Sequence, residues 1–438
     1  MQTLEQLRSG ALAGAKQLKL SCGLTAFPPQ ILDLAPTLEI LDLTGNKLSH
    51  LPPSFAQLQN LRIAFFSDND FTVFPEVLAQ CPKLEMIGFK ACQIREIPEG
   101  ALPAATRWLI LTNNHLEKLP ASIGQCTRLQ KLMLAGNRLK ELPQELAHCQ
   151  HLELLRISAN ALEELPAWLW SLPRLSWLAF AGNPCQPLAP NPAPLPTVPW
   201  PDLELEEQLG QGASGIISKA YWRRQKTHVA VKVFKGNITS DGLPQDEMSA
   251  CMAAGAHPNL VQVLGQLQQH PAGKQGLVLS LIPPDYRNLG GPPSFATCTR
   301  DVYASGTVFP LAVALRIAVG MASVAGHLHR WGILHGDLYA HNTLVNGSGH
   351  PLFGDFGAAT RYDRSNAALA ELLERIEVRA YGYLLVDLLT HLSPQDQTHG
   401  TAIALAQLKE ACLHPQVLHR PDFASIEKLL RSLPVAGE

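Results

Sequence analysis

Residues 38–60 read LEILDLTGNKLSHLPPSFAQLQN, and residues 129–151 read LQKLMLAGNRLKELPQELAHCQH. The two stretches share one pattern, LxxLxLxxNxLxxLPxxLxxCxx. Copies of this pattern begin at nearly even spacing at Leu38, Leu61, Leu84, Thr106, Leu129, Leu152 and Leu175. A single copy of this pattern cannot bury its own apolar face, so neighbouring copies must stack to form a core. The N-terminal part of the chain is therefore expected to be a solenoid.

The repeat pattern resembles that of the leucine-rich repeat, whose period is roughly 20–29 residues. The LxL residues are expected to point into the shared core from a short strand, and asparagines are expected to turn the chain by bonding backbone groups. These asparagines are Asn46, Asn69, Asn114, Asn137, Asn160 and Asn183. Cys92 replaces asparagine in one copy, which predicts a weaker turn there. Cys81, Cys126 and Cys149 share a position with leucine, and we expect them to be buried apolar fillers.

The strand residues that should face the concave side of the solenoid form a second pattern. Two columns of these positions are unusually apolar for an exposed sheet. They include Ile63, Phe65, Met86, Trp108, Ile110, Met133 and Trp177. Either another segment of the chain covers this surface, or the surface binds a partner protein. The second interpretation predicts that Trp108 and Trp177 are needed for partner capture but not for catalysis.

Composition bounds the remaining function classes. The chain has 46% hydrophobic and 16% charged residues and a formal net charge of −2, which favours neither nucleic acid nor a membrane as partner. No signal peptide is predicted, and the longest apolar candidate, residues 308–325, is interrupted by Pro310, Arg316 and Gly320 and is expected to be a core helix. Nine scattered cysteines without CxxC spacing predict a reducing, cytoplasmic setting without a zinc or disulfide framework.

A proline-rich segment follows the repeats. Residues 184–201 read PCQPLAPNPAPLPTVPWP, and proline makes up nearly half of this segment. Such a segment cannot be helical, so a semi-rigid extended spacer between two domains is expected. A ligand for proline-recognising modules is the alternative interpretation.

Four motifs follow in order after this segment. Residues 210–215 contain GxGxxG, which alone would also suit a dinucleotide-binding fold. That fold needs a helix directly after the glycines, whereas strand-like runs follow here, so a glycine-rich hairpin is favoured. THVAVKVF at residues 227–234, HGDLYAHN at residues 335–342 and FGDFG at residues 353–357 complete the series.

In this order the motifs resemble those of the protein-kinase domain. The likeness extends to CLHPQVLHRPDF at residues 412–423, which is similar to a late motif of that family. The whole chain thus resembles a leucine-rich-repeat protein kinase of the cytoplasmic, bacterial kind. The expected fold is an α/β leucine-rich-repeat solenoid at residues 1–183, the linker at 184–201, and an α+β bilobal protein-kinase-like domain at 202–438.

The resemblance implies a role for each motif residue. Lys232 should contact the ATP phosphates and pair with a carboxylate, either Glu247 or Asp246, while Asp337 should orient the acceptor hydroxyl and take its proton. The implied Mg²⁺ ligands are Asn342 and Asp355. The implied nucleotide-binding positions are Leu209, Gly210, Gly212, Gly215, Ile217, Ala230, Lys232, Glu247, Ser280 and Ile282.

Four residues depart from the family pattern. Gly336 replaces the arginine that a phosphorylated activation segment normally neutralises, which predicts activity without that phosphorylation. Tyr339 replaces the lysine of Ser/Thr kinases, which predicts slow turnover, and His341 could supply charge in a pH-dependent way. Glu377 replaces the aspartate that anchors the catalytic loop, so its anchoring is in question.

The activation segment also departs from the family pattern. It is expected to be short, running from Asp355 to a helix that begins near Tyr381, and it has no APE motif, so substrate choice could pass to the repeats. Its hydroxyl residues Thr360, Tyr362 and Ser365 are candidate autophosphorylation sites, although functionless surface positions are the simpler interpretation. The favoured function is a protein kinase, for Ser/Thr rather than Tyr. A nucleotide-binding pseudokinase scaffold and a small-molecule kinase are the alternatives.

Overall fold

The computed structural model describes residues 2–186, 195–212, 214–236 and 238–434 of the 438-residue chain. Contacts within the chain divide it into two units. The first unit holds the chain up to Arg174 together with Asn183–Cys185. The second unit holds Leu175–Gly182 and the chain from Gln186 onward.

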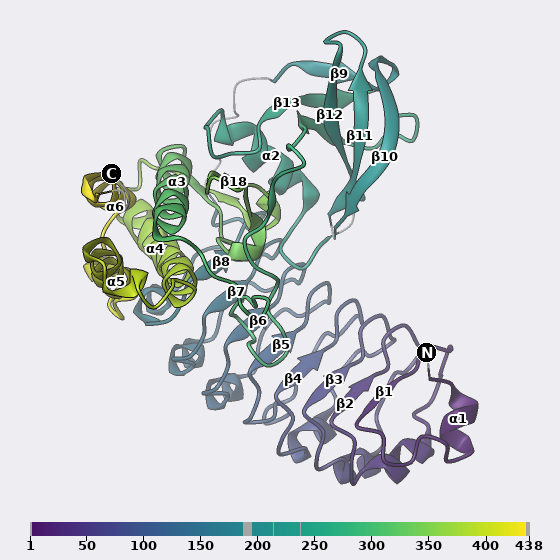
Figure 1. Cartoon of the computed structure of the whole chain (residues 1–438). Helices are drawn as coiled ribbons and strands as arrows, with labels where there is room; N and C mark the ends of the chain where they lie inside the picture. The colour runs from purple at the N-terminus through teal and green to yellow at the C-terminus, as the bar shows by residue number, and fades with distance from the viewer. Residues whose placement is uncertain (1, 187–194, 213, 237, 435–438) are drawn as a thin grey trace. The chain divides into compact units, whose positions relative to one another are not determined.

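The first unit is a solenoid of short parallel strands. After a capped helix α1 (Leu4–Arg8), one three-residue strand recurs in each repeat and pairs in register with the next one. These strands are β1 (Gln17–Lys19), β2 (Ile40–Asp42), β3 (Ile63–Phe65), β4 (Met86–Gly88), β5 (Trp108–Ile110), β6 (Lys131–Met133) and β7 (Leu154–Arg156). Figure 1 shows them as one ladder in the purple and blue part of the chain. The predicted leucine-rich-repeat fold is confirmed for this unit.

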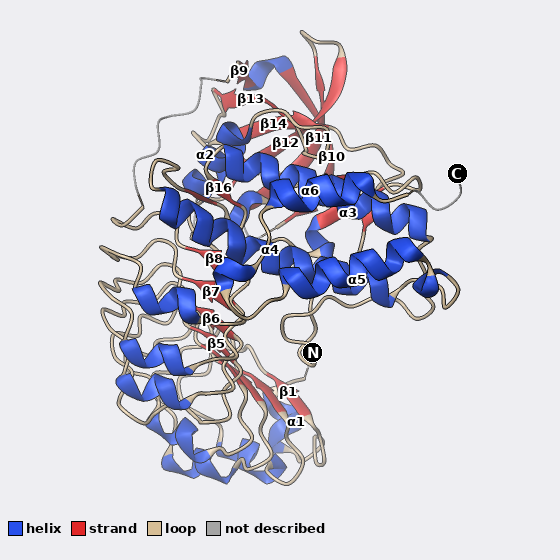
Figure 2. Ribbon diagram, turned by 90° about the vertical axis from the view of Figure 1, so that its left-hand side faces the viewer, coloured by secondary structure: helices blue, strands red, loops and turns tan. Residues whose placement is uncertain are grey.

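The opposite side of the solenoid carries short 3-10 helices (Figure 2). They are η1 (Pro29–Leu34), η2 (Pro53–Gln57), η3 (Glu76–Gln80), η4 (Ala121–Gln125), η5 (Gln144–His148) and η6 (Ala167–Ser171). A proline in extended conformation precedes each of them as its N-cap residue. Proline fixes φ and cannot donate a hydrogen bond, so each helix begins directly after it. The short repeat, with its strand and two connecting turns, leaves room for little more than one helical turn.

The repeat asparagines satisfy buried backbone groups in two repeats at once. Asn46 Oδ1 accepts from Cys22 N at 3.1 Å and from Leu24 N at 3.0 Å. Its Nδ2 donates to Leu20 O and to Leu43 O, each at 2.8 Å. The same arrangement recurs at Asn114. These contacts are the turn chemistry that the repeat pattern predicts.

Cys92 reproduces only half of this arrangement. Its thiol donates to Phe66 O at 3.1 Å, which is the bond that an asparagine Nδ2 makes elsewhere. Its sulfur is only a weak acceptor, so it replaces poorly the amide oxygen that accepts from the backbone of the preceding repeat.

The substitution Cys92→Asn is therefore expected to raise the free energy of unfolding by about 1 kcal/mol, the net value of one added hydrogen bond. The urea midpoint of the full chain measures this change. Cys81→Asn is the matched control, because Cys81 is a fully buried filler whose pKa burial raises to about 11. That control should lower the midpoint. A lower midpoint for Cys92→Asn would contradict this account of the turn.

The apolar columns of the strands are less exposed than the sequence suggests. Ile63, Met86 and Trp177 are buried, and the prediction that Trp177 lies on an open docking surface is wrong. The remaining members of the surface are half-buried. They are Phe65, Trp108, Ile110 and Met133. Trp108 Nε1 lies 3.3 Å from Met133 Sδ, so part of this surface packs on itself.

The second unit contains a six-stranded sheet, on which helix α2 (Pro244–Ala254) packs. Its strand order is β10-β11-β12-β14-β13-β9. The strands are β9 (Thr197–Pro199), β10 (Leu203–Gln211), β11 (Gly215–Trp222), β12 (Thr227–Phe234), β13 (Val263–Gln268) and β14 (Gly276–Ser280). Helix α2 packs on the sheet through Met248, which contacts Phe234 and Leu277.

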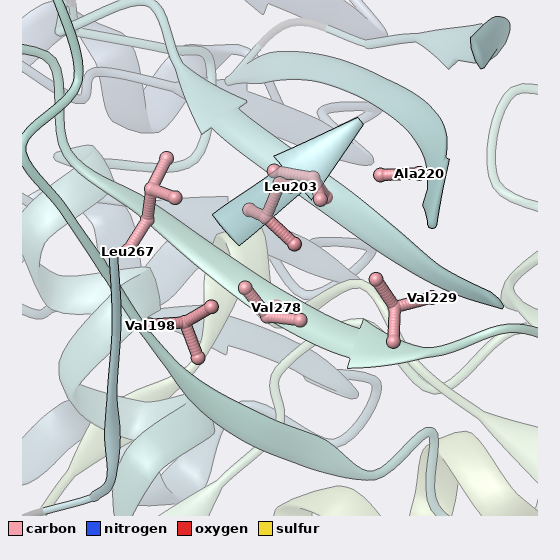
Figure 3. Close-up of a cluster of buried hydrophobic side chains, with 7 residues drawn as sticks. Val198, Leu203, Ala220, Val229, Leu267 and Val278 are labelled. Carbon is pink, nitrogen blue, oxygen red and sulfur yellow. The ribbon is translucent and has the colours of Figure 1, made fainter. Parts of the chain in front are cut away.

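Strand β9 lies inside the segment that the sequence assigns to the linker. It pairs in parallel with β13 at the sheet edge, where a proline costs no ladder bond. Val198 is fully buried and packs in one cluster with Leu203, Leu267 and Val278 (Figure 3). The end of the proline-rich segment is thus part of the six-stranded sheet and is not a spacer. Its residues 187–194 lie outside the described residues.

The rest of the second unit is mainly helical (Figure 2). Its long elements are α3 (Leu311–Arg330), α4 (Ala367–Thr390), α5 (Gly400–Cys412) and α6 (Phe423–Ser432). Short strands occur in the loop segments of this part of the chain. These are β15 (Arg287–Asn288), β16 (Ile333–Leu334), β17 (Thr343–Val345), β18 (Pro351–Phe353) and β19 (Thr360–Arg361). Short 3-10 turns complete the lobe. They are η7 (Trp200–Asp202), η8 (Ala340–Asn342), η9 (Phe356–Ala358), η10 (Asp396–Thr398) and η11 (Val417–His419).

Helix α3 contains most of the apolar stretch that the sequence singles out. Among the described helices, it is the one long and apolar enough to cross a membrane by length and composition. However, 67% of its most apolar window is buried inside the protein, as in the core helix of a globular lobe. It packs against α4 and α6.

Candidate active site

A cleft of about 840 Å³ lies between the sheet and the helical part of the second unit. Every nucleotide-binding and metal-binding position expected from the sequence lines it, from Leu209 on β10 to Asp355. The cleft also contains residues that the motifs do not reveal. Among them, Val263, Leu277 and Leu344 add apolar surface, and Cys251 follows Glu247 by one turn of α2.

The glycine-rich hairpin lines this cleft on the side of the sheet. Gly212 N donates to Gly215 O at 3.0 Å and closes the hairpin between β10 and β11. A Cβ at Gly210 or Gly212 would meet no atom within 4 Å, whereas one at Gly215 would lie 2.7 Å from Val233 O. The first two glycines therefore leave open space at the cleft, and the third allows close packing of the neighbouring strand.

Lys232 projects into the cleft from β12 and pairs with Glu247 of α2. The sequence leaves Glu247 and Asp246 open as partners, and the structure brings Glu247 to the lysine. Burial disfavours the charged ammonium, but the carboxylates of Glu247 and Asp355 outweigh burial and raise the pKa of Lys232. A permanently charged lysine, fixed by a buried carboxylate, suits contact with phosphate oxygens.

The catalytic-loop residues approach from the helical side. Asn342 Nδ2 donates to Asp337 Oδ2 at 2.7 Å and to Asp337 O at 3.1 Å. Asp355 follows β18 in the left-handed backbone region at φ 55°, a conformation that is uncommon for non-glycine residues but less so for aspartate. The buried His335 links the two segments, because its Nε2 donates to Gly354 O at 3.0 Å. Burial lowers the pKa of His335, so the neutral ring makes this bond.

Glu377 anchors the catalytic loop despite its extra methylene. Its Oε1 accepts from Gly336 N at 2.7 Å, and its Oε2 accepts from His335 N at 3.3 Å and lies 2.8 Å from His329 Nε2. Burial opposes its charge, but the bond and charge of His329 outweigh burial and lower the pKa of Glu377. The anchoring that the sequence leaves in question is therefore present, because both carboxylate oxygens of Glu377 accept backbone N–H groups of the loop.

Two further side chains in the loop do not have the surroundings that the sequence suggests. Tyr339 is buried and stacks on Trp177, so it does not take the place of a phosphate-binding lysine. His341 lines the cleft, and its Nδ1 lies 2.7 Å from Asp301 Oδ1. Asp301 Oδ2 also accepts from His341 N at 3.0 Å. Asp301 comes from a loop without a recognisable motif, so the sequence offered no signal for it.

The activation segment is shorter and more firmly held than expected. Helix α4 begins at Ala367, so it absorbs about half of the predicted segment. Thr360 is buried in β19, and Tyr362 is buried with its hydroxyl 2.8 Å from His329 Nδ1. The interpretation of these two hydroxyls as surface positions is therefore wrong. Ser365 is exposed.

Asp355 and Asn342 line the cleft, and both carry side-chain oxygen atoms, the donors that hard divalent cations prefer. Within the part of the chain that the structure describes, His, Cys, Asp and Glu side chains form no group of three or more that would hold a metal. A divalent ion bound here could take its further ligands from water or from phosphate oxygens, as Mg²⁺ does in nucleotide sites.

Comparison with known proteins agrees with these observations. Residues 203–381 match the family model of protein tyrosine and serine/threonine kinases, and residues 37–58 and 127–184 match leucine-rich-repeat models. A probable serine/threonine-protein kinase of Dictyostelium discoideum is 26% identical over 52% of this chain. A mitogen-activated protein kinase kinase kinase 10 of Xenopus laevis is 26% identical over 56%, and a serine/threonine-protein kinase of Arabidopsis thaliana is 26% identical over 54%.

The matched regions cover only 15%, 28% and 32% of these three relatives, so the likeness concerns the domain and not the whole proteins. The family models agree with the two kinds of architecture in the structure, parallel repeat strands and a sheet followed by helices. The chain therefore consists of a leucine-rich-repeat region followed by a protein kinase domain.

Proposed function

We propose that the chain is an ATP-dependent protein kinase that transfers the γ-phosphoryl group to Ser or Thr hydroxyls. The observation that carries this proposal is one cleft lined by the Lys232–Glu247 pair, Asn342 and Asp355, with Asp337 bonded to Asn342. Phosphoryl transfer depends on positioning and on neutralising phosphate charge, and these residue types supply both. The serine/threonine class is taken from the names of the relatives.

Each side chain has a role that follows from its place. Lys232 would bind phosphate oxygens with a charge that does not titrate near neutral pH. Asn342 and Asp355 would hold Mg²⁺, which neutralises phosphate charge when it is bound with the nucleotide. Asp337 would orient the acceptor hydroxyl and accept its proton, while Asn342 holds the Asp337 carboxylate in place.

The repeat unit is proposed to bind a protein partner or substrate through the half-buried part of its concave columns. Aromatic and methionine side chains, which are enriched in protein interfaces, support this use. A cytoplasmic location and a bacterial type of protein stay predictions. The nine free cysteines support a reducing compartment.

The test is transfer of labelled γ-phosphate from ATP, with the chain itself and a generic basic protein as acceptors. We expect metal-dependent label on Ser or Thr, identified by phosphoamino-acid analysis and lost with a chelator. Tight nucleotide binding without label in any protein would favour the pseudokinase scaffold. Label that leaves ATP and appears only in small molecules would favour a small-molecule kinase.

A further inference from the structure

The last strand of the repeat pattern lies against the catalytic loop. Strand β8 (Trp177–Ala179) has the repeat sequence, yet Leu175–Gly182 belongs to the second unit. Trp177 Nε1 donates to Leu338 O at 3.0 Å, one residue after Asp337. The indole also stacks on Tyr339, with ring centroids 4.2 Å apart and planes at 6°. One strand thus contacts the residues that directly follow Asp337 in the catalytic loop.

Residues that follow this strand contact the activation segment. Phe180 N donates to Thr360 Oγ1 at 3.1 Å, and both groups are buried. Just after the strand, Gln186 Nε2 donates to Arg361 O at 3.0 Å, while Gln186 Oε1 accepts from Gly182 N at 2.7 Å. Trp177 stacks with Tyr383 of α4 as well, at 5.4 Å and 18°. Trp177 of β8, together with Phe180 and Gln186 after it, therefore links the catalytic loop, the activation segment and α4.

Gly336 is the residue that lets this strand approach. It has a φ of +72°, and a Cβ there would lie 2.5 Å from Leu178 O and 2.9 Å from Ala358 O. Real side chains do not tolerate such distances to backbone atoms, and this φ is itself unfavourable for them. The glycine in place of the family arginine thus has a structural reason, which is the close contact with β8.

Contacts on both sides of Asp337 show what the strand contributes. Glu377 fixes the residues before Asp337 through two backbone N–H groups, and Asp301 fixes the loop at His341. Between these two anchors, Leu338 and Tyr339 are held by Trp177. Removal of Trp177 would leave the middle of the loop without these two contacts.

We propose that β8 is a built-in positioning element of the kinase domain, with Trp177 as a positioning residue that holds the catalytic loop around Asp337. This proposal rests on the proposed function. It makes the last copy of the repeat pattern, which belongs to the second unit, necessary for catalysis itself. It also gives the loop a permanent support of the kind that a phosphorylated activation segment supplies elsewhere.

The test compares Trp177→Ala and Trp177→Phe in the full chain. Because misplacement of a catalytic group by about 1 Å can cost about a hundredfold in rate, kcat of Trp177→Ala should fall about ten- to a hundredfold, while KM for ATP changes less than about twofold. Trp177→Phe keeps a stacking ring but loses the Nε1–H donor, so it should restore most of the rate. Trp331→Ala, at a tryptophan that is 61% exposed, is the control for kcat.

A second measurement does not depend on transfer. Amide hydrogen exchange of residues 335–342 should be at least about tenfold faster in Trp177→Ala, with exchange in β12 and α2 unchanged. Faster exchange everywhere would show general destabilisation and overturn the positioning role. Wild-type exchange in residues 335–342 would overturn it as well, as would an unchanged kcat. If the wild-type chain transfers no phosphate, the proposed function fails, while hydrogen exchange still decides whether Trp177 holds the loop.

Discussion

Gly336→Arg, which restores the arginine of the kinase family, is expected to abolish phosphate transfer and to destabilise the second unit. The new Cβ would lie 2.5 Å from Leu178 O, and the backbone would keep a φ of +72° that arginine rarely adopts. Backbone strain of this kind costs about 1–3 kcal/mol, and overpacking of a dense contact costs about 1–3 kcal/mol more. The sum is a large part of the roughly 5–15 kcal/mol that stabilises a typical domain.

The measurement is urea unfolding together with labelled-phosphate transfer for Gly336→Ala and Gly336→Arg. Because the first side-chain carbon makes the clash, both variants should lose stability and activity. Gly347→Arg is the matched control, since a Cβ at Gly347 meets no atom within 4 Å. If the Gly336→Arg variant is active and stable, the contact between β8 and the catalytic loop is not as close as described. Loss for arginine alone would assign the effect to the size or charge of the longer side chain and not to the Cβ contact.

Asp337→Asn is expected to lower the transfer rate by about a thousandfold and to leave ATP affinity within about threefold of the wild type. Positioned general bases contribute about 10²–10⁴ in rate. Asp337 does not line the nucleotide cleft, so its neutralisation should not disturb nucleotide contacts. Asparagine has nearly the same shape and keeps an oxygen that can accept from Asn342 Nδ2.

Asp396→Asn is the control, because Asp396 begins the short turn η10 in front of α5. Transfer rates and nucleotide titrations of the three proteins separate an enzyme from a scaffold. Equal transfer by wild type and Asp337→Asn would remove Asp337 from the mechanism. Loss of nucleotide binding in the variant would place Asp337 in the binding site instead.

The repeats and the cleft were accessible from sequence for different reasons. The repeat pattern recurs at a fixed period, so each copy supports the assignment of its neighbours. The role of Asn46 and Asn114 in the turns could therefore be predicted from the local pattern alone. The cleft residues occur in motifs whose order is itself informative, and Lys232 and Asp355 line one cavity as expected. Glu247 was found through its position on the helix after the glycine-rich hairpin.

The contacts of β8 could not be deduced in the same way. Repeat periodicity assigns Trp177 to an exposed column, but the pattern carries no information on a partner as distant in the chain as Leu338. For the same reason, the sequence alone shows Tyr339 only as a tyrosine at a position where Ser/Thr kinases have lysine. The structure shows that its ring stacks on Trp177. The burial of Val198 could not be predicted either. The proline-rich composition around it indicates an extended linker and gives no sign of an edge strand with one buried residue.

The most direct test of the account is the time course of phosphate transfer by the unphosphorylated protein. Intact-mass measurement first confirms that the protein carries no phosphate. Because β8 already holds the catalytic loop and the activation segment, transfer should be linear from the first turnovers. Phosphatase pretreatment should leave its rate unchanged. Two results would contradict the account and show that activation requires phosphorylation. One is a lag in phosphate transfer that disappears after preincubation with ATP, and the other is loss of transfer after phosphatase treatment.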